Sequence, residues 1–279
     1  MVKITIPVRT LAFASLLTLL WIAVPAASLT VQPAAEQDDW CRDDYHGDDD
    51  RAHHCEVRQL STPATGAMLQ VDARPNGGIR VHGSDRADIM VWAKVTTTAR
   101  ALDEARAIAS RVVVTATSDR VEADGPRNLG RHEGWQVSYR LDVPRATPLS
   151  LRTVNGGIRI DNVRSQIAFR TTNGGVSLSR VGGDVEGRTT NGGLKIDLDG
   201  ATWDGGGLDV ETSNGSVNLS VPEGYSARLE TGTINGRMQI DFPMTVQGTI
   251  GRSVTVDLGS GGPLLRARTS NGTVRIRRR

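Results

Sequence analysis

Apolar and polar residues alternate around a short phrase that recurs through the second half of the chain. The phrase Thr-x-Asn-Gly occurs with its asparagines at Asn155, Asn173, Asn191, Asn214, Asn235 and Asn271. The third and fifth residues after each asparagine are apolar in every copy, and the residues between them are mostly polar. Such a period of two is typical of a half-buried strand. The residues four and six places before the asparagine follow the same alternation, so each copy predicts strand, turn and strand.

The asparagines are separated by 18, 18, 23, 21 and 36 residues. An Asn-Gly pair between alternating runs is the strongest hairpin signal, so a meander of antiparallel hairpins stays open. The near-constant period and the same residue type at each phase favour a stack of coils, a solenoid. Its Asn-Gly turns would form a corner column and its threonines a ladder of hydroxyls. Residues 253–258 keep the alternation without the phrase, which predicts a degraded coil between Asn235 and Asn271.

Residues 57–148 are β-rich but less regular than residues 149–279. Asn76-Gly77 has the same apolar positions as the later copies, which predicts a first coil. Further strands are expected over 89–95, 112–117 and 135–143. Residues 99–111 form the one amphipathic helical pattern, whose apolar face carries Leu102, Ala105, Ile108 and Ala109. We expect this helix to cap or flank the solenoid and to shield an unpaired edge.

The N-terminus has the three-part layout of a secretory signal peptide over residues 1–28. Lys3 and Arg9 precede an apolar run over 11–24, and small residues follow at 26–28. The run is shorter than the ~20 residues that span a bilayer as a helix. We therefore expect cleavage, no transmembrane helix in the mature chain, and export to the periplasm, the cell surface or the exterior.

Residues 29–56 read as an acidic, flexible segment that contains both cysteines. Residues 36–50 carry eight acidic side chains against Arg42, whereas the whole chain has a net charge of +2, which predicts no nucleic-acid partner. Cys41 and Cys55 would form a disulfide in an oxidising compartment. The alternative is a metal site that adds His46, His53, His54 and the aspartates, but the spacing fits no zinc template. We expect neither a metal nor a cofactor.

The chain is similar to a known family at the entry to the regular repeats. Tyr-Arg-Leu-Asp-Val-Pro at 139–144, then Leu-Ser-Leu-Arg-Thr-Val-Asn-Gly-Gly-Ile at 149–158 and the coils that follow resemble the bacterial β-strand-repeat family of candidate adhesins of unknown function. The resemblance covers about residues 56–279. It implies an all-β, right-handed parallel β-solenoid with one short helix, exported to the envelope or surface, and the spacing of the asparagines predicts coils of about 18–23 residues. It implies no catalytic residues.

Two kinds of side chain are weak candidates for binding or chemistry. Asp161, Asp197 and Asp241 each stand six residues after an asparagine. Acids on alternate stacked coils would lie ~10 Å apart, near the upper limit for an inverting carboxylate pair. Alternatively, they are solvated residues that alternate with serines to avoid like-charge stacking. Trp203, in a Gly-rich insertion over 199–207, either projects as a contact residue or packs back over the coil, and Tyr225 is a further aromatic candidate.

Three functions follow from these patterns. The favoured one is a non-enzymatic, exported solenoid that acts as an adhesin-like or scaffold protein and binds a cell-surface glycan or an envelope protein. The second is a polysaccharide-active enzyme that uses the stacked aspartates. The third is an envelope signalling partner that interacts through residues 36–50.

Overall fold

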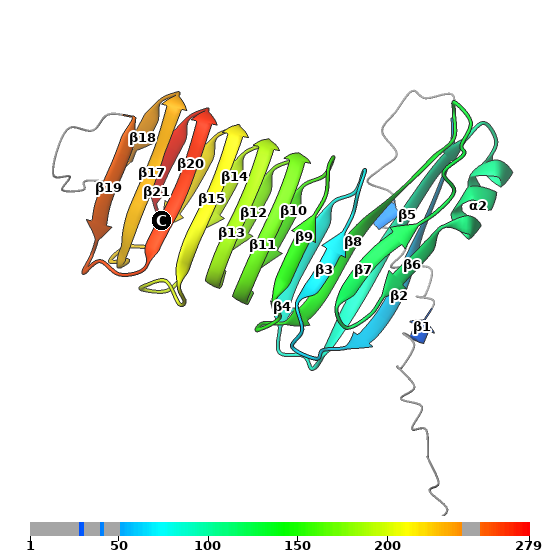
Figure 1. Ribbon diagram of the computed structural model, residues 1–279, viewed down its shortest axis with the longest axis horizontal. Helices are drawn as coiled ribbons and strands as arrows, with labels where there is room; N and C mark the ends of the chain where they lie inside the picture. The colour runs from blue at the N-terminus through cyan, green and yellow to red at the C-terminus, as the bar shows by residue number, and fades with distance from the viewer. Residues whose placement is uncertain (1–27, 31–39, 42–50, 242–251) are drawn as a thin grey trace, which may run out of the picture.

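The computed structural model describes residues 28–30, 40–41, 51–241 and 252–279. The predicted signal peptide, except Ser28, and most of the acidic segment lie outside the described residues. Two long sheets and one helix make up the described part of the chain. Figure 1 shows the coils side by side along the long axis, with α2 (Leu102–Arg111) near one end and β19 (Ser253–Leu258) at the other.

The first sheet, sheet A, contains eleven strands in the described part of the chain. In spatial order they are β1 (Ser28–Thr30), β2 (Ala52–Pro63), β5 (Asp88–Ala99), β8 (Gly134–Pro144), β4 (Ile79–Ser84), β10 (Ile158–Asp161), β12 (Val176–Ser179), β14 (Leu194–Asp197), β16 (Val217–Val221), β21 (Val274–Arg278) and β18 (Met238–Ile240). The first four strands pair antiparallel, and from β8 onward every pair is parallel.

Sheet B contains ten strands. In spatial order they are β19, β17 (Ala227–Asn235), β20 (Leu264–Asn271), β15 (Gly207–Asn214), β13 (Gly182–Asn191), β11 (Arg164–Asn173), β9 (Leu149–Arg152), β3 (Leu69–Asp72), β7 (Arg120–Asp124) and β6 (Val113–Ala116). Only the terminal pairs, β19 with β17 and β7 with β6, are antiparallel. The parallel pairing of all repeat strands excludes the meander of hairpins.

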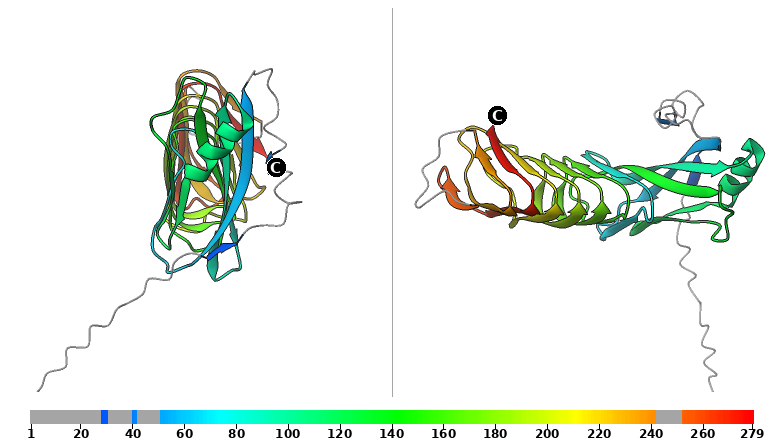
Figure 2. Two further views of the ribbon diagram at one scale, coloured as in Figure 1. Left: turned by 90° about the vertical axis from the view of Figure 1, so that its right-hand side faces the viewer. Right: turned by 90° about the horizontal axis from the view of Figure 1, so that it is seen from above.

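Each coil contributes one strand to sheet A and one to sheet B, and we name it by its corner asparagine. The apolar residues at the third and fifth positions after that asparagine point into the space between the sheets. Their stacks run through Ile158, Val176, Leu194, Val217 and Val274 and through Ile160, Leu178, Ile196, Leu219 and Ile276, all of which are buried. The end-on view in Figure 2 shows the strands of successive coils lying behind one another. The core predicted from the period of two is therefore confirmed.

Each of the three residues that recur in every copy of Thr-x-Asn-Gly has its own structural role. Each Asn amide donates to the Asn of the neighbouring coil; for example, Asn191 Nδ2 lies 2.8 Å from Asn173 Oδ1. Each Thr hydroxyl donates to a glycine carbonyl of the neighbouring coil, as Thr189 Oγ1 does to Gly174 O at 2.9 Å. The threonines do stack in register as the predicted ladder, and each hydroxyl in it donates to a backbone carbonyl of the neighbouring coil.

The glycine of the phrase provides room for the neighbouring backbone. A Cβ built on Gly174 would lie 2.0 Å from the carbonyl oxygen of Gly156. Gly174 does not adopt a positive φ, and among the glycines of the phrase only Gly272 does, with a nearly extended φ of 158°. Close stacking of successive corners thus explains the glycine, whereas the positive φ of a hairpin turn does not.

The order of the last coils differs from the prediction. The Asn271 coil lies between the Asn214 coil and the Asn235 coil, because β20 pairs with β15 on one side and β17 on the other. Residues 253–258 do form a strand, but β19 pairs antiparallel at the edge of sheet B and is no coil between Asn235 and Asn271. The C-terminus accordingly lies within the row of coils in Figure 1.

The N-terminal half closes the opposite end of the stack. Helix α2 packs on β5 and β2 through Ala105, Ile108 and Ala109, which confirms a flanking helix. The helix begins at Leu102 instead of residue 99, and Leu102 is 42% exposed, so its predicted place on the buried face was wrong. Strand β2 begins at Ala52, inside the segment assigned as flexible. The predicted disulfide between Cys41 and Cys55 is confirmed.

Candidate functional site: a basic groove on sheet A

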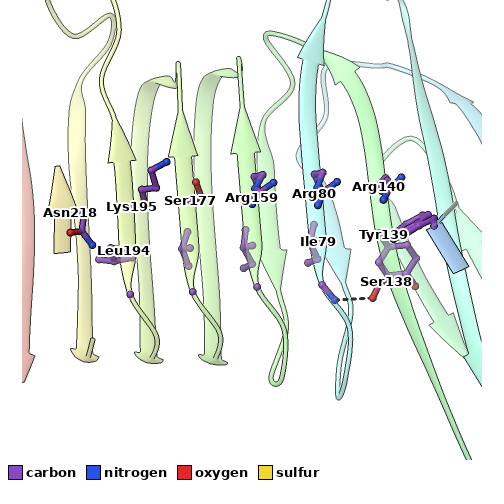
Figure 3. A pocket seen from close by; sticks show the side chains of 17 residues that line it. Ile79, Arg80, Ser138, Tyr139, Arg140, Arg159, Ser177, Leu194, Lys195 and Asn218 are labelled. Atoms are coloured by element: carbon purple, nitrogen blue, oxygen red, sulfur yellow. Dashed lines mark hydrogen bonds between the residues drawn. The ribbon is translucent and has the colours of Figure 1, made fainter. Parts of the chain in front are cut away.

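One row of outward side chains crosses sheet A from strand to strand. Because successive residues of a strand point to opposite faces, the residue between the two buried positions of each coil points outward. In register, the row reads Gln59, Trp92, Arg140, Arg80, Arg159, Ser177, Lys195, Asn218, Arg275 and Gln239. We call Arg140, Arg80, Arg159 and Lys195 the cation row. Figure 3 shows Arg140, Arg80 and Arg159 on adjacent strands of the sheet, with Ser177 on the strand between Arg159 and Lys195.

A groove of about 520 Å³ runs along this row. Its floor is bare backbone at four glycines, Gly78, Gly157, Gly175 and Gly193. The amide of Gly78 is held by Ser138 Oγ at 3.1 Å (Figure 3). On the next coils the same place carries Ser216 and Thr273, so the glycine floor ends where the groove ends.

Trp40 stands at the N-terminal end of the groove. The guanidinium carbon of Arg140 lies 3.9 Å from the centre of the Trp40 ring, and Lys94 Nζ lies 5.3 Å from it. The neighbouring disulfide from Cys41 to Cys55 ties this tryptophan to β2. A smaller cavity of about 220 Å³ shares Trp40, Arg80 and Arg140 and extends to Trp92.

The basic side chains of the groove differ in whether they form an ion pair with an acidic side chain. Lys195 forms an ion pair of 3.2 Å with Asp197. Neither Arg80 nor Arg159 has an ion-pair partner in the described part of the chain, and both side chains are exposed. The groove can therefore offer two adjacent, solvated guanidinium groups to an anion.

The aspartate candidates lie one row away from the groove. Asp161 binds His82 Nδ1 at 2.9 Å and also forms an ion pair with Arg180. Asp161 and Asp197 stand on alternate coils, separated by the Asn173 coil. Asp241 is further away than expected, because the Asn271 coil lies between the Asn214 and Asn235 coils. The structure thus joins the first two aspartates to cations of the same face and leaves Asp241 at its end.

The aromatic candidates are not on the groove. Trp203 is buried, and its indole nitrogen donates to the Gly183 carbonyl at 2.9 Å. Of the two alternatives predicted for Trp203, the structure shows the second, in which the ring packs back over the coil. Tyr225 is also buried, and burial raises the pKa of its hydroxyl to about 12. Neither ring presents an exposed face to a ligand.

The sequence analysis did not identify the groove residues as a site, although several of them occupy polar positions of the repeat pattern. The alternation identified Arg159 and Lys195 only as polar positions, because their joint row depends on the stacking order. Trp40 gave no signal, since it stands in the acidic segment far from the repeats in sequence.

Two further features of the described residues bear on chemistry. They contain no group of three or more His, Cys, Asp or Glu side chains placed to hold a metal ion; His46 and Asp43, Asp44 and Asp48–Asp50 lie outside them. They also contain no helix of the length and apolar character that a membrane crossing needs.

Comparisons with known proteins point to one family. Residues 105–277 match the model of the Toastrack DUF4097 family. The fold is similar to that of a candidate cell adhesion protein from Clostridium sporogenes ATCC 15579, with 10% identity, 82% of this chain and 100% of that chain covered, and a TM-score of 0.47. The fold is also similar to that of a candidate adhesin from Bacteroides fragilis NCTC 9343, with 12% identity, 81% of this chain and 97% of that chain covered, and a TM-score of 0.32. A candidate lipid binding protein from Parabacteroides distasonis ATCC 8503 is 9% identical, with 80% and 96% coverage and a TM-score of 0.32. No curated protein matches the sequence.

Proposed function

The chain belongs to the Toastrack DUF4097 family, and from the groove on sheet A we propose that it is an exported, non-enzymatic, adhesin-like protein that binds an extended glycan chain. The groove is the observation that carries this proposal. It runs across successive coils, and its glycine floor leaves room for a ligand that lies along the stack. A linear polymer fits such a site better than a compact small molecule, because the glycine backbone of the groove repeats from coil to coil about 4.8 Å further on.

Export is supported by two independent features. Residues 1–28 have the layout of a signal peptide, and the Cys41–Cys55 disulfide is typical of oxidising compartments. The proposed location is the periplasm or the cell surface. The right-handed winding of the coils, which the family resemblance implies, stays a prediction of the same proposal.

The experiment that tests the proposal measures binding and turnover together. The chain from residue 29 is incubated with a panel of envelope and plant polysaccharides, and bound protein and released sugar ends are recorded in the same wells. Binding without release is the expected result. Release that is lost on Asp161→Ala or Asp197→Ala would favour the polysaccharide-active enzyme instead. Capture of an envelope protein that depends on residues 36–50, without any glycan binding, would favour the signalling partner.

A matched pair of variants tests whether the glycan binds in the groove. Gly175→Gln puts a neutral side chain on the groove floor, where a Cβ would have an ordinary contact of 3.4 Å with Gly193 O. Ala168→Gln adds the same side chain to sheet B of the same coil. We expect Gly175→Gln to weaken glycan binding and Ala168→Gln to leave it unchanged. Equal affinities of the two variants would remove the groove from the proposal.

A further inference from the structure

The groove has a charge pattern that selects among glycans. Arg140, Arg80 and Arg159 stand on three adjacent strands, and Lys195 follows after Ser177. Adjacent strands are about 4.8 Å apart, which is comparable with the length of one sugar unit in an extended chain. Arg80 and Arg159 can therefore present about one cation to each of two successive sugar units, and Arg140, which stacks on the Trp40 ring, extends the row. Resting on the proposed function, we infer that the groove binds a linear polysaccharide with a carboxylate on each unit, a polyuronate.

The borders of the cation row limit the width of the anion. On one side lie the glycine floor and the neutral Asn ladder. On the other side, two residues along each strand, lies a row that includes Asp142, Asp161 and Asp197. A duplex nucleic acid carries one charge per ~1.7 Å of its axis on two strands, so part of its phosphates would face these aspartates. A single chain with one carboxylate per unit meets only the cations.

The neighbouring carboxylates leave the charge of Arg80 and Arg159 available. Asp161 is engaged by His82 and Arg180, and Asp142 lies 3.9 Å from Arg86. These ion pairs satisfy the acids with cations that are not in the groove. Lys195, by contrast, shares its charge with Asp197 of the bordering row. A carboxylate entering the groove thus finds its best partners at Arg80 and Arg159, where bidentate hydrogen bonds are possible.

Trp40 and Trp92 add a surface for sugar rings at one end of the groove. Both are half-buried and line the smaller cavity together with Arg80 and Arg140. An aromatic ring is a platform for the apolar face of a pyranose. A single-stranded nucleic acid would instead require aromatic rings at successive positions along the row. In the described part of the groove, the positions beyond Arg140 carry Arg, Ser, Lys and Asn, which favours the polyuronate.

The test compares polygalacturonate with the same backbone after full methyl esterification, in solution with the chain from residue 29. The test variant is Arg80→Gln with Arg159→Gln. The control is Arg152→Gln with Arg170→Gln, which removes two exposed charges from adjacent coils of sheet B. We expect polygalacturonate binding to fall about tenfold in the test variant, to weaken with added salt and to stay within about twofold in the control.

Three outcomes would overturn the inference, and they differ in what they say of the proposed function. Equal binding of the methyl ester would mean that the groove takes a neutral glycan, so the proposed function would stand while the charge selection falls. Equal binding of polyphosphate or single-stranded DNA, lost in the same variant, would mean a general polyanion site. Absence of binding to any charged or neutral polysaccharide would remove the proposed function as well.

Discussion

Asn271 donates a hydrogen bond of 2.8 Å from its side-chain amide to Asn214, although 57 residues separate the two along the chain. Asn235, which comes between them in sequence, donates in turn to Asn271 at 2.9 Å. The last coil of the chain is therefore an inner coil of the stack. The Asn235 coil and β19 can dock fully only after the C-terminal residues have entered the sheets.

This order predicts that the last coil stabilises the coils on both of its sides. Leu265 is buried between Leu208 and Leu229 in register. Leu265→Ala should cost about 2–5 kcal/mol of unfolding free energy and should speed amide hydrogen exchange in both β15 and β17. Leu229→Ala removes the same atoms one coil further out, and its effect should spare β15. Fast exchange in β17 alone after Leu265→Ala would contradict the inserted position.

A charge in the inner stack should unfold several coils together. Ile196 is fully buried, between Leu178 and Leu219 in register. Ile196→Asp would bury an unpaired carboxylate at a cost of several kcal/mol, which lowers the melting temperature and the far-UV β signal. The exposed Thr190→Asp is the control in the same coil and should unfold as the wild type does. An unchanged melting temperature for Ile196→Asp would show that the side chain is not inward in solution.

Gly187 leaves space in the core for the ring of a neighbouring coil. It stands beside Phe169 in register, and a Cβ on Gly187 would lie 2.2 Å from the ring. Gly187→Ala should therefore cost about 1–3 kcal/mol by overpacking. In the double variant with Phe169→Leu, the cost of adding the methyl group should largely disappear. Additive costs in this double-mutant cycle, measured by urea unfolding, would contradict direct contact.

The sequence predicted those features that depend on a local period. The inward positions of Ile160, Leu178 and Ile196 follow from alternation in a strand, and the fixed length of the copies favoured parallel coils. The spatial order of the Asn235 and Asn271 coils cannot be predicted from the period, because both coils carry the same phrase and either could stack on the Asn214 coil. The pairing of Phe169 with Gly187, by contrast, does follow from the period, because both stand four residues before the asparagine of consecutive coils.

The candidate site was less predictable than the fold. A row such as Arg140, Arg80 and Arg159 combines residues from β8, β4 and β10, and β4 lies between the other two strands in the sheet although it precedes both in the sequence. Whether Trp203 is exposed or buried depends on the path of the insertion over 199–207, and the repeat pattern does not extend to this insertion. Local chemistry was visible in the sequence, but its assembly into a groove required the three-dimensional order of the strands.

Alkaline pH should destabilise the fold partly through Tyr139. Its buried hydroxyl has no hydrogen-bond partner among the described residues. Burial, with the nearby carboxylates of Asp72 and Glu122, raises its pKa above the ordinary value. The raised pKa means that the folded state favours the protonated phenol, so stability is fully present below about pH 10 and falls above it, by about 1.4 kcal/mol per pH unit.

The measurement is urea unfolding of the wild type and Tyr139→Phe between pH 8 and pH 11.5. At pH 8 the variant should be as stable as the wild type or more stable, because it removes a buried hydroxyl without a partner in the described residues. Above pH 10 the variant should lose stability less steeply. Tyr225, whose pKa is raised to about 12 by burial, remains in both proteins and contributes equally. Parallel pH profiles would assign the alkaline loss to other groups.

Two adjacent glycines of one corner should respond in opposite ways to the same added methyl group. A Cβ on Gly174 would meet the Gly156 carbonyl oxygen at 2.0 Å, whereas a Cβ on Gly175 would lie 3.4 Å from Gly193 O. Gly174→Ala must push two coils apart and strain the Asn and Thr bonds beside it, so we expect a loss of about 1–3 kcal/mol or more. Gly175→Ala should be neutral or stabilise by up to about 1 kcal/mol, because alanine restricts the unfolded chain. Thermal unfolding of the two variants checks this, and similar losses in both would mean that the corner requires glycine for its backbone angles and not for close stacking.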